Sequence, residues 1–142
     1  MTPDAGTLRK FAERYTAAWC SRDAACVAAF YSSLGSLRVN DGAPAVGRAA
    51  IQEVAQGFMT AFPDLRVSMD DIRVEGDRAE YHWTLTGTNT GPAGTGQRVR
   101  LSGFESWALG EDGLIAESRG RFDPIEYQRQ LEHGTEASRR SR

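Results

Sequence analysis

The sequence predicts an α+β fold, in which helices from the first half of the chain cover one face of a curved antiparallel sheet and leave room for an apolar pocket. Apolar residues recur at steps of three and four up to about residue 62, which is helical spacing, and at every second residue from Leu65 onward, which is strand spacing. No internal repeat or linker interrupts the 142 residues. We therefore expect a single domain over residues 1–133 and a flexible tail over residues 134–142.

The first half of the chain carries the helical spacing. Residues 7–20, with Thr7 as the cap, are expected to form an amphipathic helix whose aromatic face needs a cover. A short second helix carries Val27 and Tyr31 on one side. An extended stretch over residues 37–39, a turn over residues 40–44 and a third helix over residues 48–62 follow. Pro63 ends the third helix because proline disfavours helical geometry in the residue before it.

The second half carries the strand spacing, interrupted by turns. Asp70-Asp71 shifts the alternation by one residue, as a β-bulge does. The clearest strand is residues 78–88, in which apolar side chains alternate with polar ones. Asp123 followed by Pro124 starts a last short helix, with Asp as the cap and Pro at the first position. The expected strands cover residues 65–74, 78–88, 98–109 and 114–123, with a flexible loop over residues 89–97.

Charge and composition exclude several classes of protein. The chain holds 17 Lys and Arg against 19 Asp and Glu, whereas a duplex-binding domain carries a clustered basic excess, so no nucleic-acid partner is expected. Cys20 and Cys26 lack metal-ligand spacing, which predicts reduced, buried thiols and no metal. No apolar run approaches the roughly 20 residues of a membrane span, and the start lacks an apolar signal segment. These features predict a cytoplasmic protein with no membrane partner.

Several short motifs occur in a characteristic order, namely FPDLRV at residues 62–67, HWTLTGTNTG at 82–91, EDGLIAE at 111–117 and FD at 122–123. Together they resemble the SnoaL-like polyketide cyclases, in the superfamily of nuclear transport factor 2, ketosteroid isomerase and limonene epoxide hydrolase. The likeness covers about residues 7–131. It implies a cone-shaped sheet with a helix-lidded apolar pocket on its concave side, a homodimer formed largely through the sheet, and acid/base chemistry without a cofactor on a small hydrophobic molecule.

The resemblance gives Asp123 the first place among the catalytic candidates. In the cyclases an acidic residue near the end of the last strand is the acid/base of an intramolecular aldol closure, and Asp123 stands there. An apolar cavity would raise the pKa of this carboxyl toward the range useful for proton transfer. The alternative is that Asp123 only caps the last helix. Alternation places Arg119 and Arg121 on the same side, as pocket residues whose charge would instead lower that pKa.

The alignment also points to the strand that contains His82 and Thr84. In the epoxide hydrolases these two places hold an Arg and an Asp that assist water activation, so the polar face of the strand would line the cavity. His82 is then the imidazole available for catalysis, with a structural role as the alternative. The missing carboxylate at Thr84 argues against the hydrolase mechanism. The apolar face would need a cover, which predicts a dimer through Ala79, Tyr81, Trp83 and Leu85.

The remaining candidates are aromatic or polar side chains expected near the pocket. Tyr15 stands where relatives often place a hydroxyl donor and would hydrogen-bond a substrate carbonyl or enolate, with core packing as the alternative. Glu105 interrupts the apolar face of its strand, as a second pocket carboxylate or as a dimer contact. The candidates for the pocket wall, each with ordinary core packing as the alternative, are Trp19, Phe58, Phe62 and Trp107.

Two classes of function are compatible with these residues. The first is a cofactor-independent acid/base enzyme that cyclises or isomerises a polyketide-like or other hydrophobic carbonyl substrate, with Asp123 as the acid/base and His82 as the polarising group. The second is a non-catalytic protein that binds a small hydrophobic ligand. An epoxide-hydrolase-like enzyme is a further alternative.

Overall fold

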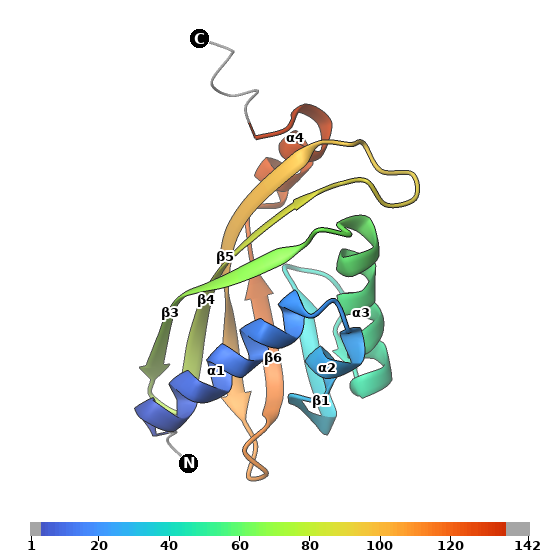
Figure 1. Ribbon diagram of the computed structural model, residues 1–142. Helices are drawn as coiled ribbons and strands as arrows, with labels where there is room; N and C mark the ends of the chain where they lie inside the picture. The colour runs from blue at the N-terminus through green and yellow to red at the C-terminus, as the bar shows by residue number, and fades with distance from the viewer. Residues whose placement is uncertain (1–3, 136–142) are drawn as a thin grey trace.

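Six strands form one curved sheet in the order β2-β1-β6-β5-β4-β3, with helices packed against it (Figure 1). The computed structural model describes residues 4–135, so most of the expected flexible tail lies outside the described residues. The helices are α1 (Ala5–Cys20), α2 (Ala24–Ala28), α3 (Arg48–Ala61) and α4 (Pro124–His133). The strands are β1 (Tyr31–Val39), β2 (Ala45–Val46), β3 (Arg66–Glu75), β4 (Arg78–Thr88), β5 (Arg98–Leu109) and β6 (Ile115–Arg121). The α+β class predicted from the sequence is confirmed.

The segment around β1 is where the structure differs most from the expected elements. The prediction that Tyr31 belongs to the second helix is wrong, because α2 ends at Ala28 and Tyr31 is the first residue of β1. β1 pairs in parallel with β6, with Leu37 opposite Ser118, whereas the β3–β4, β4–β5 and β5–β6 pairings are antiparallel. The sequence of β1 mixes serine and glycine with isolated apolar residues, so its alternation is weak.

Two smaller expectations near the N-terminus also change. α1 begins earlier than expected, because Asp4 rather than Thr7 is its cap and accepts a hydrogen bond of 2.9 Å from the Thr7 N–H. Cys20 and Cys26 are both free, as expected, but neither is buried as predicted: Cys20 is half-buried and Cys26 is exposed. Among residues 4–135, no helix is long and apolar enough to cross a membrane.

The expected β-bulge in β3 is confirmed. The register between β3 and β4 shifts between Met69 and Asp71. Met69 lies opposite Trp83 before the shift, and Ile72 lies opposite Tyr81 after it. Because the extra residue restores the alternation, apolar side chains on both sides of the bulge point to the same face of the sheet.

The face of β4 that lines the core is the opposite of the predicted one. Ala79, Tyr81 and Leu85 are buried, and Tyr81 packs edge-on against Tyr15 of α1 at a ring distance of 5.4 Å. His82 therefore points to the outer face with its polar neighbours, and the prediction that this polar face lines the cavity is wrong. The helices already cover the apolar face, so that face does not require a partner chain. A dimer through the sheet stays a prediction of the family resemblance.

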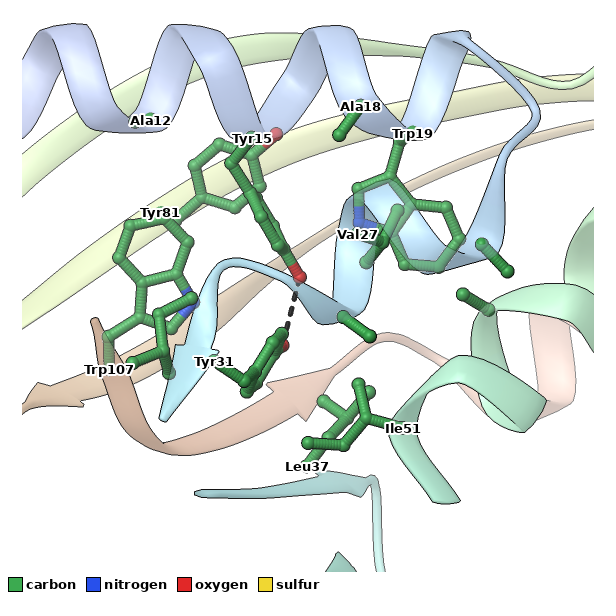
Figure 2. Packing of buried hydrophobic residues seen from close by; sticks show 14 of the residues in the cluster. Ala12, Tyr15, Ala18, Trp19, Val27, Tyr31, Leu37, Ile51, Tyr81 and Trp107 are labelled. Carbon is green, nitrogen blue, oxygen red and sulfur yellow. Dashed lines mark hydrogen bonds between the residues drawn. The ribbon is translucent and has the colours of Figure 1, made fainter. Parts of the chain in front are cut away.

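The core at this end of the molecule is built from aromatic rings. Tyr81 and Trp107, on neighbouring strands, are stacked at a ring distance of 4.9 Å, and Tyr15 meets the Trp107 ring edge-on at 5.2 Å. Figure 2 shows Tyr15 reaching down from α1 between these two rings and Tyr31. Large rings that interlock in this way fix the angle at which α1 crosses the sheet.

The loop after β4 closes against the end of α3. The side-chain amide of Asn89 and the backbone N–H of Gly91 both donate to the carbonyl of Ala61, at 3.1 and 3.2 Å. A Cβ at Gly91 would overlap the carbonyl oxygen of Thr60. Only glycine therefore allows the loop to come this close to the helix.

We predict opposite effects for two glycine substitutions that both add one methyl group. Gly91→Ala forces the loop away from α3 and should destabilise the fold by about 1–3 kcal/mol, as overpacking does. Gly57→Ala, within α3, meets nothing within 4 Å and should stabilise by up to about 1 kcal/mol through helix propensity. Urea unfolding of both variants measures this. Equal midpoints for the two would contradict the described loop contact.

Candidate functional site

An apolar cavity lies between the inner face of the sheet and the helices. Its lining is of the kind that surrounds small hydrophobic molecules in proteins. The wall is mostly apolar and rich in aromatic rings. Among the described residues, Glu105 is the only acidic or basic side chain that lines it. The aromatic residues of the wall are Trp19, Phe58, Phe62, Tyr81, Trp83, Phe122 and Tyr127. Of the expected pocket residues, Trp19, Phe58, Phe62 and Glu105 lie here.

Glu105 belongs to the inner face because of the two-residue period of β5. It stands opposite Tyr81 of β4 and Gly120 of β6, in a row that otherwise carries apolar side chains. Only 8% of the residue is exposed. A carboxyl group in such surroundings needs hydrogen-bond donors, because it is cut off from most of the water that would solvate it.

The donors to Glu105 converge on one of its two oxygens. Oε1 accepts from the Trp107 indole N–H at 2.8 Å, from the Ser118 hydroxyl at 2.9 Å and from the Tyr15 hydroxyl at 3.1 Å. Oε2 has one partner among the described residues, the same Tyr15 hydroxyl at 3.2 Å. The carboxyl is thus anchored through Oε1, while Oε2 is the oxygen with capacity left for a molecule in the cavity.

Tyr31 completes this group of donors. Its hydroxyl lies 2.9 Å from that of Tyr15 and 3.5 Å from Glu105 Oε1, and Figure 2 shows the contact between the two tyrosines. Burial, and after it the charge of Glu105, raises the pKa of both tyrosines well above the usual value. Both are therefore neutral hydroxyl groups at physiological pH and can donate to the carboxyl.

Two effects of opposite sign act on the pKa of Glu105. Burial raises it, because the charged form loses its solvation, and the hydrogen bonds from Trp107, Ser118, Tyr15 and Tyr31 lower it. Burial is the larger effect, so the pKa lies above the ordinary glutamate value. A carboxyl with this balance exchanges a proton closer to neutral pH than an exposed one does.

Asp123, the expected acid/base, lies elsewhere. It is exposed and caps α4, accepting from the N–H groups of Ile125 at 2.9 Å and Glu126 at 3.2 Å. It is not among the residues that line the cavity, although its neighbour Phe122 is. The physical reason is local: the chain turns from β6 into α4 at this point, and the cap geometry holds the carboxylate against the end of the helix.

The two arginines near Asp123 point to the outer face of the sheet. Arg119 pairs with Glu117 at 3.3 Å, and Arg121 pairs with Asp41 at 3.1 Å rather than with Asp123. Both arginines are exposed. The structure therefore does not bring them to the cavity, because from Glu117 onward the odd-numbered residues of β6 face outward, while Ser118 and Gly120 face inward.

His82 and Thr84 occupy the same outer face, on β4. The His82 ring nitrogen Nε2 lies 3.1 Å from Glu80, and the Thr84 hydroxyl bonds to Asp70 and Ser102. Neither residue lines the cavity. Trp107 and Tyr15, in contrast, are buried beside Glu105 and act on the cavity through it.

Sequence reasoning did not identify Tyr31 and Ser118 as parts of the site. Tyr31 reaches Glu105 from β1, through the parallel β1–β6 pairing that the sequence analysis did not predict, whereas Ser118 lies on β6, directly beside β5. Ser118 is completely buried on the inner face of β6, and a polar residue in that position is a signal that could have been found. Among residues 4–135, no group of His, Cys, Asp or Glu is arranged to hold a metal ion.

α4 contributes Tyr127 to the wall of the cavity. Its Tyr127 packs on Phe62 and Phe122, at ring distances of 6.4 and 5.4 Å. Gln130 fastens the helix: its amide accepts from the Arg100 N–H at 2.6 Å and donates to the Arg100 carbonyl at 3.0 Å. Because the pairing with β6 starts only at Phe104, this side-chain amide takes the place of a strand at the free edge of β5.

Comparison with known proteins agrees with this architecture. The model of the SnoaL-like domain family matches residues 12–118. TsrD from Streptomyces laurentii is similar in structure, with a TM-score of 0.77 and 25% identity over 91% of this chain and 97% of that one. A protein from Jannaschia sp. CCS1 described as a SnoaL-like polyketide cyclase has a TM-score of 0.78 and 17% identity, over 93% of this chain and 96% of that one.

A third solved structure is SalBIII, an epoxide hydrolase/cyclase-like enzyme in pyran ring formation in the polyether salinomycin. It matches with a TM-score of 0.74 and 16% identity, over 87% of this chain and 95% of that one. No curated protein sequence matches the chain. At 17% and 16% identity, the protein from Jannaschia sp. CCS1 and SalBIII share the fold with this chain, and the likeness shows no more than that.

We predict that Gln130→Ala loosens α4 over the cavity. The substitution leaves the N–H and carbonyl of Arg100 without partners, which should cost about 1–3 kcal/mol of stability. Hydrogen exchange of the Arg100 amide should accelerate. Gln128→Ala is the matched control, because Gln128 is exposed and bonds only to Glu132 one turn along the same helix. Equal protection of Arg100 in both variants would show that Gln130 does not hold the helix.

Proposed function

Because the chain belongs to the SnoaL-like domain family, we propose that it is an acid/base enzyme that acts without a cofactor on a hydrophobic carbonyl compound. One observation carries the proposal: a buried carboxyl group, Glu105, lines an aromatic cavity and keeps one oxygen available. Apolar walls suit a polyketide-like or other largely hydrocarbon substrate. SalBIII, an enzyme of the same fold that acts in pyran ring formation, supports small-molecule chemistry of this kind.

The proposed step is the transfer of one proton. Oε2 of Glu105 takes a proton from the carbon next to the substrate carbonyl, and the electron pair of the C–H bond moves to the carbonyl oxygen as an enolate. The enolate then either takes the proton back at another carbon, which isomerises the substrate, or attacks a second carbonyl, which closes a ring. Glu105 returns its proton to that carbon in the first case and to the alkoxide oxygen formed from the second carbonyl in the other, so it is unchanged overall.

This proposal gives Glu105 the role that the resemblance assigned to Asp123. A general base must reach the proton that it removes, and Glu105 lines the cavity whereas Asp123 caps α4 at the surface. His82 lies on the outer face, so the polarising group must come from elsewhere. Trp83 suits that role, because it lines the cavity and its buried indole N–H has no partner among the described residues.

A second candidate function is the binding of a hydrophobic ligand without catalysis. The observation that favours it is the anchoring of Glu105 Oε1 by Trp107, Ser118 and Tyr15. Such anchoring also fits a carboxyl that serves only to hold α1, β5 and β6 together. The two functions differ in whether Glu105 exchanges protons with a bound molecule.

We predict that the protein catalyses exchange of the α-protons of 2-tetralone, a hydrophobic ketone, with D₂O. Proton NMR follows the loss of the α-proton signal. Glu105→Gln should lower the catalysed rate at least about 100-fold, because it removes the base but keeps the shape of the side chain. Asp123→Asn should leave the rate within a factor of about two, because it changes only the cap of α4.

Quenching of tryptophan fluorescence reports binding of 2-tetralone independently, since Trp19 and Trp83 line the cavity. Binding with no catalysed exchange would favour the ligand-binding protein over the enzyme. A large loss of rate in Asp123→Asn, with Glu105→Gln unaffected, would return the catalytic role to Asp123.

We predict a dependence on pH that Tyr15 controls. The base form of Glu105 is needed, so the exchange rate should fall as pH drops through its raised pKa. Tyr15→Phe removes a hydrogen bond that lowers this pKa, so the fall should move to higher pH. Thr16→Ala is the control, because this hydroxyl on the same helix bonds to Tyr81 and not to Glu105. An unmoved pH profile in Tyr15→Phe would contradict the assignment.

A further inference from the structure

We propose that the molecule taken up by the cavity carries a positively charged nitrogen, which lies against Glu105 Oε2 with its hydrocarbon groups on the aromatic wall. The inference rests on the same site as the proposed function and adds the charge of the substrate to it. Three observations support it: the sign of the charge in the cavity, the way in which Glu105 is hydrogen-bonded, and the chemistry of the wall.

The first observation is a buried acid without a counter-charge. No Arg, Lys or His lines the cavity or bonds to Glu105 among residues 4–135. The groups that face the carboxyl are Tyr15 from α1, Tyr31 from β1, Tyr81 from β4, Trp107 from its own strand and Ser118 from β6, all of them neutral. Buried glutamates are almost always paired with a cation, so the missing partner points to the ligand.

The second observation is that the donors suit a carboxylate. Trp107, Ser118 and Tyr15 all donate to Oε1, within 3.1 Å. The carbonyl oxygen of a neutral carboxylic acid has two lone pairs and accepts two such bonds well, whereas a carboxylate oxygen holds more charge and accepts three. The protein thus stabilises the negative charge at Oε1 with three hydrogen bonds. The charge on Oε2, which the carboxylate shares equally with Oε1, is left for the ligand to pair.

The third observation is the wall itself. Trp19 and Phe58 approach the cavity from the helices, Trp83 from the sheet, and Phe122 and Tyr127 from the end of the chain. The faces of aromatic rings carry negative charge density and attract organic cations, most strongly where water is excluded. Aromatic rings around a single carboxylate are a suitable cage for an alkylammonium group, and they disfavour a substrate with a carboxylate or a phosphate.

A cationic nitrogen would also assist the proposed chemistry. Next to the carbon that loses its proton, it attracts the electron pair that develops on the substrate and stabilises the enolate. The charge on the ligand and the base form of Glu105 then depend on each other. A cation in the cavity favours the carboxylate, and the carboxylate is the form that removes a proton.

The test uses a permanent cation and a neutral molecule of the same shape. Benzyltrimethylammonium and neopentylbenzene differ only in a positively charged nitrogen in place of a carbon, and tryptophan fluorescence measures both affinities at pH 8. We expect the cation to bind at least tenfold more tightly. In Glu105→Gln the affinity for the cation should fall at least tenfold, while the affinity for neopentylbenzene stays the same.

Equal or tighter binding of neopentylbenzene to the unchanged protein would overturn the proposal, as would a cation preference that is undiminished in Glu105→Gln. Calorimetry in buffers of different ionisation enthalpy adds a readout of the carboxyl itself. Binding of the cation below the raised pKa should release protons, the release should vanish in Glu105→Gln, and a release that persists in this variant would also contradict the assignment. These measurements need no turnover, so the charge of the ligand and the proton exchange with 2-tetralone can fail separately.

Discussion

The hydrogen-bonded carboxyl of Glu105 is the interaction on which the arrangement of the molecule depends. Its partners come from α1, β1, β5 and β6, so a single buried group joins the first helix to the middle of the sheet. A buried carboxyl that loses a hydrogen-bond donor destabilises the folded state, and each partner is therefore held in its place. The same bonds that satisfy Oε1 orient the carboxyl toward the cavity. The stability of the fold and the chemistry of the cavity thus both depend on the side chain of Glu105.

Strand alternation decides which residues share this environment. On β6, Ser118 faces inward and Arg119 outward, so one residue contacts Glu105 and the next belongs to the ion pairs of the outer face. On β4 the same rule separates Tyr81 from His82. The bulge in β3 corrects the phase of that strand, so that its apolar residues stay on the cavity side. The chemistry of the cavity is therefore set by which alternate residues of each strand face inward.

The fold class, the bulge and most element positions could be predicted from the sequence, because periods of 3.6 and 2 are local signals. The face of β4 could not, because both sets of side chains on that strand are regular and the alignment favoured the polar one. For Asp123, the local Asp-Pro pattern correctly indicated a helix cap, whereas the family resemblance suggested a catalytic acid/base. Glu105 was visible as a break in an apolar face, but its contact with Tyr31 depends on a parallel pairing between distant segments, which no local pattern reveals.

The parallel β1–β6 pairing also sets an order of events when the chain is made. Tyr31 pairs with Ile115, so β1, which until then has only the two-residue strand β2 beside it, waits for nearly the whole of the remaining chain before it gains its second neighbour in the sheet. Long-range pairing of this kind slows folding, because a large loop must close first. Ser118 belongs to β6, so Glu105 lacks one of its hydrogen-bond donors until that strand is in place. A ribosome-bound chain that stops short of β6 would have α1, α2, α3 and the strands β3, β4 and β5, but its Glu105 would lack the hydrogen bond from Ser118.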